Sequence, residues 1–119
     1  MTEPRTYTGG CHCGLVRFEC TSDLATVTAC NCSICTKKGL HLTFLPPSSF
    51  TLRAGGDVLR EYRFHKKVIG HQFCAECGTE VYANGAMPDG TPIVAVNVSC
   101  LDGIDLAEIK MRPHNGRAD

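Results

Sequence analysis

The sequence predicts a mainly β fold, and three observations carry that prediction. Short segments rich in β-branched and aromatic residues recur along the 119-residue chain, as is typical of strands. Turn signals separate these segments, among them Pro46-Pro47, Gly55-Gly56-Asp57 and Met87-Pro88-Asp89-Gly90. No long stretch shows the periodicity of an amphipathic helix. We therefore expect several small antiparallel sheets.

The strand-like segments can be placed one by one. They occupy residues 15–20, 40–45, 50–53, 59–64, 68–73, 80–83 and 93–98. In the first, Val16, Phe18 and Cys20 alternate with charged residues, which predicts one buried face. A short helix is expected near 105–109, with Asp105 as its N-cap.

Length and charge narrow the class of protein. The length suits a single domain, 1–119, with a core at about 8–100 and a polar C-terminal tail at about 101–119. Twelve basic residues balance twelve acidic ones, which argues against a nucleic-acid partner. No apolar run approaches the roughly 18 residues of a membrane span, and the first residues lack the apolar stretch of a secretory signal. We expect a cytoplasmic protein with no membrane partner.

Nine cysteines are unusual for a chain of this kind, and an odd number cannot all pair within one chain. In a reducing compartment, clustered thiols indicate metal binding or catalysis. Seven of the nine form three clusters: Cys11-x-Cys13, Cys30-x-Cys32-x-x-Cys35 and Cys74-x-x-Cys77. Cys20 and Cys100 lie on alternating apolar patterns and are expected to be buried, unreactive thiols.

The pair Cys74 and Cys77 is the strongest local signal. Two thiolates at this spacing can bind one zinc ion, and Gly78 lets the chain turn away afterwards. Cys11 and Cys13 are followed by a glycine in the same way. Neither pair completes a tetrahedral site alone, so a structural zinc with four cysteines is the preferred interpretation. A redox Cys-x-x-Cys is the alternative, although no βαβ pattern surrounds it.

The cluster of Cys30, Cys32 and Cys35 supplies three sulfurs at once. Three ligands leave the fourth position of a zinc ion open, as in catalytic sites. Three thiolates suit a soft fourth ligand such as an external thiol, which would be held as thiolate. A closed structural site is the alternative, completed by another cysteine or by a histidine such as His41.

Basic residues follow this cluster. Lys37 and Lys38 come directly after it, and Arg60, Arg63 and the run His65-Lys66-Lys67 form a second group. Both groups are compatible with solvated surfaces. Alternatively, Lys37 and Lys38 orient the carboxylates of a peptide thiol such as glutathione.

Together the three clusters resemble the glutathione-dependent formaldehyde-activating enzyme family, which includes centromere protein V. The resemblance rests on Gly10–Gly14, on the triple-cysteine cluster, and on His71-Gln72-Phe73-Cys74-Ala75-Glu76-Cys77-Gly78. It extends over about residues 8–100 and includes the stretch 55–64.

The resemblance implies a fold, two zinc ions and a reaction. The fold would be a β-tent of several coiled antiparallel sheets stapled by zinc. Cys11, Cys13, Cys74 and Cys77 would hold a structural zinc. Cys30, Cys32 and Cys35 would hold a second zinc that binds the sulfur of glutathione, and that thiolate would add to formaldehyde.

Two hypotheses follow for the function. The first is a carbon–sulfur lyase that resembles S-(hydroxymethyl)glutathione synthase, with glutathione and a small aldehyde as its partners. The second is a zinc-stabilised module without chemistry of its own, which binds a partner or carries a thiol. An exchangeable fourth ligand at the second zinc distinguishes the first from the second.

Overall fold

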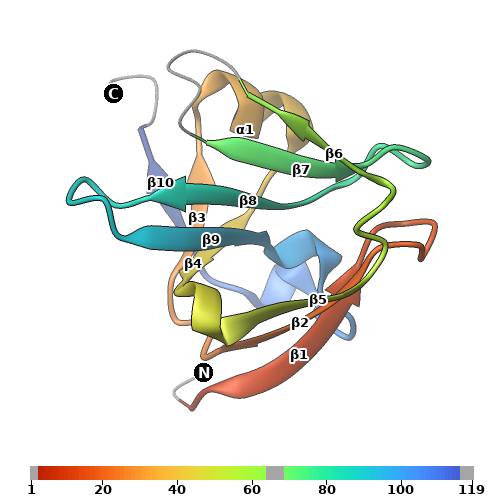
Figure 1. Cartoon of the computed structure of the whole chain (residues 1–119). Coiled ribbons are helices and arrows are strands. Elements are labelled where there is room, and N and C mark those ends of the chain that lie inside the picture. Colours follow the sequence, from red (N-terminus) through yellow and green to blue (C-terminus); the bar gives the residue numbers. More distant parts are fainter. Residues whose placement is uncertain (1–2, 64–68, 116–119) are drawn as a thin grey trace.

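The computed structural model describes residues 3–63 and 69–115 as two sheets and one short helix (Figure 1). The strands are β1 (Arg5–Gly10), β2 (Arg17–Ser22), β3 (Val27–Cys30), β4 (Leu42–Leu45), β5 (Phe50–Ala54), β6 (Leu59–Tyr62), β7 (Gly70–Cys74), β8 (Glu80–Ala86), β9 (Pro92–Asn97) and β10 (Met111–His114). The helix α1 spans Ser33–Lys38, and three 3-10 turns are η1 (Pro47–Ser49), η2 (Val98–Cys100) and η3 (Leu106–Glu108). The mainly β prediction is confirmed.

The strands divide into a sheet of three and a sheet of seven. The small sheet has the order β1-β2-β5, and the large one has the order β10-β3-β4-β9-β8-β7-β6. Every paired neighbour is antiparallel except β10 with β3, which run parallel. Figure 1 shows the small sheet below the strands β7, β8 and β9, with α1 at the other end of the molecule.

All seven predicted strands are present, with shifted ends. The segment expected at 15–20 begins two residues later as β2, and the one expected at 93–98 ends in the 3-10 turn η2. Residues 64 and 68, at the ends of two predicted strands, lie outside the described residues. The helix expected near 105–109 is the single turn η3, and Asp105 caps it by accepting a hydrogen bond from the Ala107 backbone N–H.

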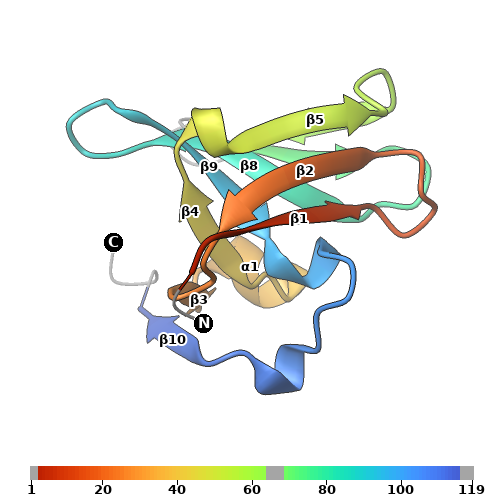
Figure 2. The ribbon, with the colours of Figure 1, turned by 90° about the horizontal axis from the view of Figure 1, so that it is seen from below.

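Besides the 3-10 turns η1 and η2, three strands and the helix were missing from the prediction: β1, β3, β10 and α1. Each is four to six residues long, so none offers enough residues for a clear periodic pattern. The last strand lies in the segment expected to be a polar tail. Figure 2 shows how this C-terminal segment curves from η2 through η3 to reach β3.

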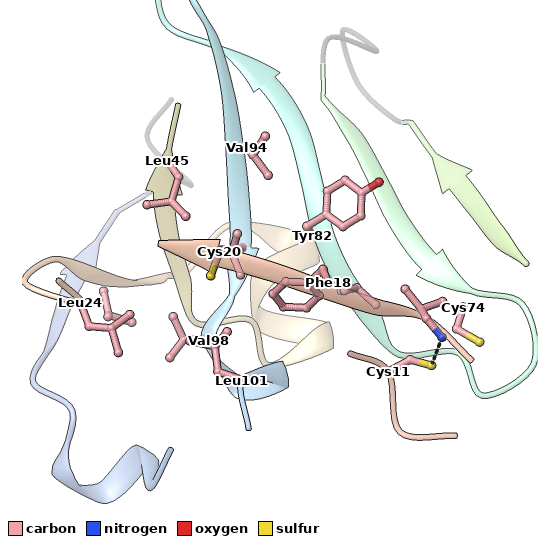
Figure 3. Close-up of a cluster of buried hydrophobic side chains, with 14 residues drawn as sticks. Cys11, Phe18, Cys20, Leu24, Leu45, Cys74, Tyr82, Val94, Val98 and Leu101 are labelled. Atoms are coloured by element: carbon pink, nitrogen blue, oxygen red, sulfur yellow. Dashed lines mark hydrogen bonds between the residues drawn. The ribbon is translucent and has the colours of Figure 1, made fainter. Parts of the chain in front are cut away.

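The main hydrophobic core lies between the two sheets (Figure 3). Phe18 is 1% exposed and stacks on Phe50, with 5.3 Å between the ring centroids. Phe50 in turn contacts Tyr82 of the large sheet, at 4.6 Å between centroids. The aromatic residues therefore join the two sheets. At one end of this core Figure 3 shows Cys11 and Cys74 close to each other.

A close approach between β1 and the turn η2 requires glycine at position 9. A Cβ atom there would lie 2.5 Å from the Cys100 carbonyl oxygen and 2.7 Å from Cζ of Phe18. The approach allows the Asp102 backbone N–H to donate to the Thr8 carbonyl at 2.8 Å. Gly9 thus lets β1 pack against the C-terminal segment.

We expect Gly9→Ala to lower the free energy of unfolding by roughly 1–3 kcal/mol, because the added methyl group must displace backbone and a core ring. Urea unfolding would measure this. Gly56→Ala is the matched control, since the nearest atom to its new Cβ would be Leu52 Cδ2 at 3.5 Å. Equal unfolding free energies for the two variants would contradict the close-approach explanation.

Candidate metal centres

The first candidate centre lies between the tips of two hairpins. Cys11 and Cys13 lie in the connection from β1 to β2, Cys74 ends β7, and Cys77 lies in the connection from β7 to β8. The four Sγ atoms all lie within 4.8 Å of one another. We call these four residues the tetracysteine group. The structure therefore brings together the two cysteine pairs that the resemblance assigned to one zinc.

Local backbone structure explains how each hairpin tip presents two sulfurs. In the first, the Cys11 backbone N–H donates to the Val16 carbonyl at 3.1 Å, and Gly14 follows with a φ of +85°. In the second, the Gly78 N–H donates to the Cys74 carbonyl at 2.8 Å, with a φ of +81°. A positive φ is unfavourable for residues with a Cβ. The expectation that Gly78 lets the chain turn away after Cys77 is confirmed.

The spacing of the sulfurs fits a tetrahedral ion. Sγ of Cys13 lies 3.6 Å from Sγ of Cys11 and 3.7 Å from Sγ of Cys74. A zinc ion with four Zn–S bonds of about 2.3 Å places its sulfurs about 3.8 Å apart. These separations are far longer than the roughly 2.05 Å of a disulfide, and all nine cysteines are free.

Hydrogen bonds favour the thiolate form at two of the four sulfurs, those of Cys11 and Cys77. The Val16 backbone N–H donates to Sγ of Cys11 at 3.3 Å. Sγ of Cys77 lies 3.4 Å from the Thr79 hydroxyl oxygen. The pKa of Cys77 is lowered to about 5, chiefly by the hydrogen bond with the Thr79 side chain and secondly by a hydrogen bond with the Thr79 backbone. A thiol with this pKa is ionised at neutral pH and ready to bind a cation.

The second candidate centre consists of Cys30, Cys32 and Cys35, which we call the tripod. Cys30 ends β3, Cys32 is the N-cap of α1, and Cys35 lies within the helix. Their Sγ atoms also lie within 4.8 Å of one another. The Cys32 backbone N–H points at Sγ of Cys30, 3.4 Å away. Both groups can hold a metal ion, and the donor sets suit zinc.

The helix that shapes the tripod is held by burial and by its C-cap. Ile34 and Cys35 are buried in a second apolar cluster with Leu40, Leu42, Ala83 and Ala95. Gly39 ends the helix with a φ of +64°, and the Leu40 N–H donates to the Cys35 carbonyl at 3.1 Å. Burial raises the pKa of the Cys35 thiol, and Cys32 beside it raises it further.

The alternative in which His41 completes the tripod is not supported. The Nδ1 atom of His41 lies 3.1 Å from the Ser99 hydroxyl oxygen. Within residues 3–63 and 69–115, the group of potential ligands around the tripod contains the three cysteines alone. His12, between two tetracysteine ligands, is exposed and is outside that group as well.

The two lysines after the tripod differ in their surroundings. Lys37 is exposed, whereas Nζ of Lys38 lies 3.0 Å from Oε1 of Glu80 and 5.0 Å from the centroid of the Phe73 ring. Their role toward a ligand stays a prediction. In the second basic group, Arg63 pairs with Glu61, and His65, Lys66 and Lys67 lie outside the described residues.

The two remaining cysteines belong to the core. Cys20 is buried to 1% exposure, and burial raises its pKa to about 11. Cys100 is half-buried, and its pKa is raised to about 12, again chiefly by burial. Such thiols are protonated at neutral pH and therefore poor nucleophiles.

Glu80 is the residue of this region that the sequence did not single out. Its side chain is 1% exposed at the start of β8 and contacts both Lys38 and His71. One feature of the sequence could have pointed to Glu80: it is a lone acidic residue directly before the apolar run Val81-Tyr82-Ala83. A glutamate is rarely buried unless its carboxylate is paired, so its place at the start of a buried strand indicates a basic partner.

Comparison with known proteins agrees with this arrangement. The family model described as "Glutathione-dependent formaldehyde-activating enzyme" matches residues 6–115. The chain belongs to this family. A crystal structure of a Rhodobacter sphaeroides protein is similar to the chain, with a TM-score of 0.79 and 27% sequence identity over 89% of this chain and 97% of that one. The part of the chain that matches the family model begins before the first cysteine cluster and ends after the last, so it includes all three clusters.

The part of the chain that the structure describes contains no helix long and apolar enough to cross a membrane.

We expect the double variant Cys13→Ser/Cys77→Ser to reduce the number of tightly bound divalent ions by one, because a serine hydroxyl is a poor zinc ligand and each hairpin tip then keeps a single sulfur. Native mass spectrometry after zinc loading would count the ions. Cys100→Ser is the matched control, since Sγ of Cys100 lies 3.5 Å from the Glu80 carbonyl and a hydroxyl can keep that contact. An unchanged ion count in this double variant would exclude the tetracysteine group as a metal site.

Proposed function

We propose that the protein is a zinc-dependent carbon–sulfur lyase that adds glutathione to formaldehyde or a related small aldehyde. The observation that carries the proposal is the difference between the two centres. Among the described residues, the tetracysteine group has four converging sulfurs and the tripod has three. A four-coordinate ion at the tripod has one position for an external ligand. A structural zinc in the tetracysteine group and a second zinc in the tripod make two per chain.

The tripod suits a thiol as that ligand. Three thiolates give a soft, electron-rich set of donors, which favours sulfur as the fourth ligand. A zinc ion bound there would lower the pKa of an incoming thiol, so that the thiol is ionised at neutral pH. The residues Cys30, Cys32 and Cys35 therefore have a catalytic role in this proposal, and membership of the formaldehyde-activating family supports glutathione as the thiol.

The reaction needs little besides a positioned thiolate. The glutathione thiol gives its proton to water, its sulfur attacks the carbonyl carbon, and a C–S bond forms. The π electrons of the carbonyl move to its oxygen, which takes a proton from water, and the product is S-(hydroxymethyl)glutathione. Cys30 and Cys32 are half-buried residues, whereas Cys35 is buried, so in this proposal both reactants approach the tripod from the side of Cys30 and Cys32. Holding the reactants together is the main source of acceleration.

Lys37 is the better candidate of the two lysines for binding the carboxylates of glutathione. It lies two residues after Cys35 and is exposed on the last turn of α1. Lys38 instead directs its ammonium group toward Glu80. In this proposal both lysines add positive charge near the tripod, and Lys37 contacts the ligand. The expected location of the protein is the cytoplasm, where glutathione is abundant.

We expect the zinc-loaded protein to accelerate the exchange between glutathione and S-(hydroxymethyl)glutathione, and Cys35→Ser to abolish the acceleration. Two-dimensional exchange NMR on mixtures of glutathione and formaldehyde would measure the rate. Cys100→Ser should keep the wild-type rate. Glutathione binding without acceleration in the wild-type protein would favour a thiol carrier, and two bound zinc ions without glutathione binding would favour a non-catalytic module.

A second prediction concerns Lys37. Lys37→Ala should raise the Kd for glutathione about three- to fivefold, because an exposed charge pair contributes up to roughly 1 kcal/mol. Isothermal titration calorimetry would measure the Kd, and 2-mercaptoethanol, which has no carboxylate, should bind equally well to both proteins. Lys110→Ala, an exposed lysine on another segment, serves as control. Equal glutathione affinity in Lys37→Ala and wild type would remove Lys37 from the site.

A further inference from the structure

The carboxylate of Glu80 is buried between two basic side chains. Its Oε1 lies 3.0 Å from Nζ of Lys38, and its Oε2 lies 2.9 Å from Nδ1 of His71. The Glu80 side chain is 1% exposed and that of His71 is 5% exposed. A buried carboxylate is costly unless partners compensate its charge. The contact with Lys38 is an ion pair without hydrogen-bond geometry, since Oε1 makes no hydrogen bond among the described residues, and it gives the buried carboxylate a compensating charge.

The three residues come from segments that carry both candidate centres. Lys38 is the last residue of α1, one turn after Cys35 of the tripod. His71 lies on β7, and Glu80 begins β8, so they flank Cys74 and Cys77 of the tetracysteine group. The Glu80 carboxylate therefore connects the helix of the tripod to the hairpin that holds the other centre.

Glu80 itself is firmly placed. Its backbone carbonyl accepts a hydrogen bond from Nδ2 of Asn97 on β9 at 2.9 Å. Across the ladder it stands opposite Phe73, at the irregularity in the pairing of β7 with β8. Phe73 is the ring over which the Lys38 ammonium lies, 5.0 Å from the centroid. Glu80 and Phe73 thus both contact the Lys38 ammonium group at the end of α1.

The helix needs such an anchor. With six residues, α1 is far below the length at which a helix is stable by itself. Its N-cap Cys32 makes no side-chain capping hydrogen bond. The apolar contacts of Ile34 and Cys35 hold α1 against the sheet but are non-directional. Metal ligands require positions correct to a few tenths of an ångström.

We propose that Glu80 is a positioning residue for the tripod: through Lys38 it fixes the orientation of α1 in which Cys32 and Cys35 share one metal ion with Cys30. This inference rests on the proposed function, in which the tripod holds a metal. It assigns Lys38 to the protein's own carboxylate and leaves Lys37 for the ligand.

Titration with Co²⁺ tests the inference, because sulfur-to-cobalt charge transfer and the d–d bands report both affinity and geometry. Cys35→Ser identifies which step of the wild-type titration belongs to the tripod. Glu80→Gln keeps the shape of the side chain and removes its charge. We expect the tripod to lose about tenfold in Co²⁺ affinity, with altered d–d bands, as for supporting residues of other metal sites. The tetracysteine step should stay unchanged, which shows that the variant is folded.

Two further variants separate positioning from a general loss of stability. Glu19→Gln removes the carboxylate of the exposed pair with Arg53, whose N–O distance is 3.2 Å, and should leave both steps unchanged. Lys38→Met approaches the same contact from the helix. It should weaken the tripod step as Glu80→Gln does, and the double variant should lose no more than either single one.

The outcomes distinguish the inference from the proposed function. A wild-type protein that binds Co²⁺ in two steps, with both steps unchanged in Glu80→Gln and in Lys38→Met, overturns the inference and leaves the proposed function standing. Additive losses in the double variant also overturn it, because they show that Glu80 and Lys38 act separately. A wild-type protein that binds one ion, at the tetracysteine group, overturns the proposed function and the inference with it.

Discussion

Four sulfur atoms meet between the tips of two hairpins that belong to different sheets, and the rest of the structure depends on this meeting. Cys11 and Cys13 come from the three-stranded sheet, and Cys74 and Cys77 come from the seven-stranded one. Between the sheets lies a core whose largest fully buried side chain is Phe18. A small core supplies limited stability, whereas a structural zinc contributes roughly 10–16 kcal/mol of apparent binding free energy. A metal at the hairpin tips would therefore hold the two sheets in the relative position that the contacts between Phe18, Phe50 and Tyr82 require.

The two cysteine groups offer the same ligand chemistry with different numbers of sulfurs. The tetracysteine group is built on two hydrogen-bonded turns, and the measured separations of its sulfurs fit a tetrahedral ion. The tripod is built on a strand end and a short helix, and three sulfurs leave an ion coordinatively incomplete. A closed set of ligands favours stability, and an open one favours exchange with an external ligand. Glu80 lies between them, with its backbone in the hairpin of the first group and its carboxylate on the helix of the second.

Strands with a buried face were predictable because their alternation is written in the chain. Phe18 and Cys20 on β2, and Val94 and Val96 on β9, are buried as the pattern indicates. β1 was missed because Thr6, Thr8 and Gly9 lack such a pattern; its partner β2 and the approach to Cys100 specify it. β10 was missed for a similar reason, since its parallel pairing with β3 joins residues 84 positions apart. Pairing of this kind depends on where the chain returns, which local propensity does not encode.

The sequence by itself determined the chemistry of the two centres: seven cysteines in three clusters, divided into four and three, with glycines after both pairs. Ligand type and short-range spacing are local properties, so they can be deduced from the chain alone. Only the tertiary structure decided which pairs meet, because Cys13 and Cys74 are separated by 61 positions and are brought to 3.7 Å by the folding of two sheets. The tertiary structure also decided that His41 turns to Ser99, and that Lys38 turns to Glu80. Side-chain partners of this kind follow from burial and from the path of the backbone, which no local pattern specifies.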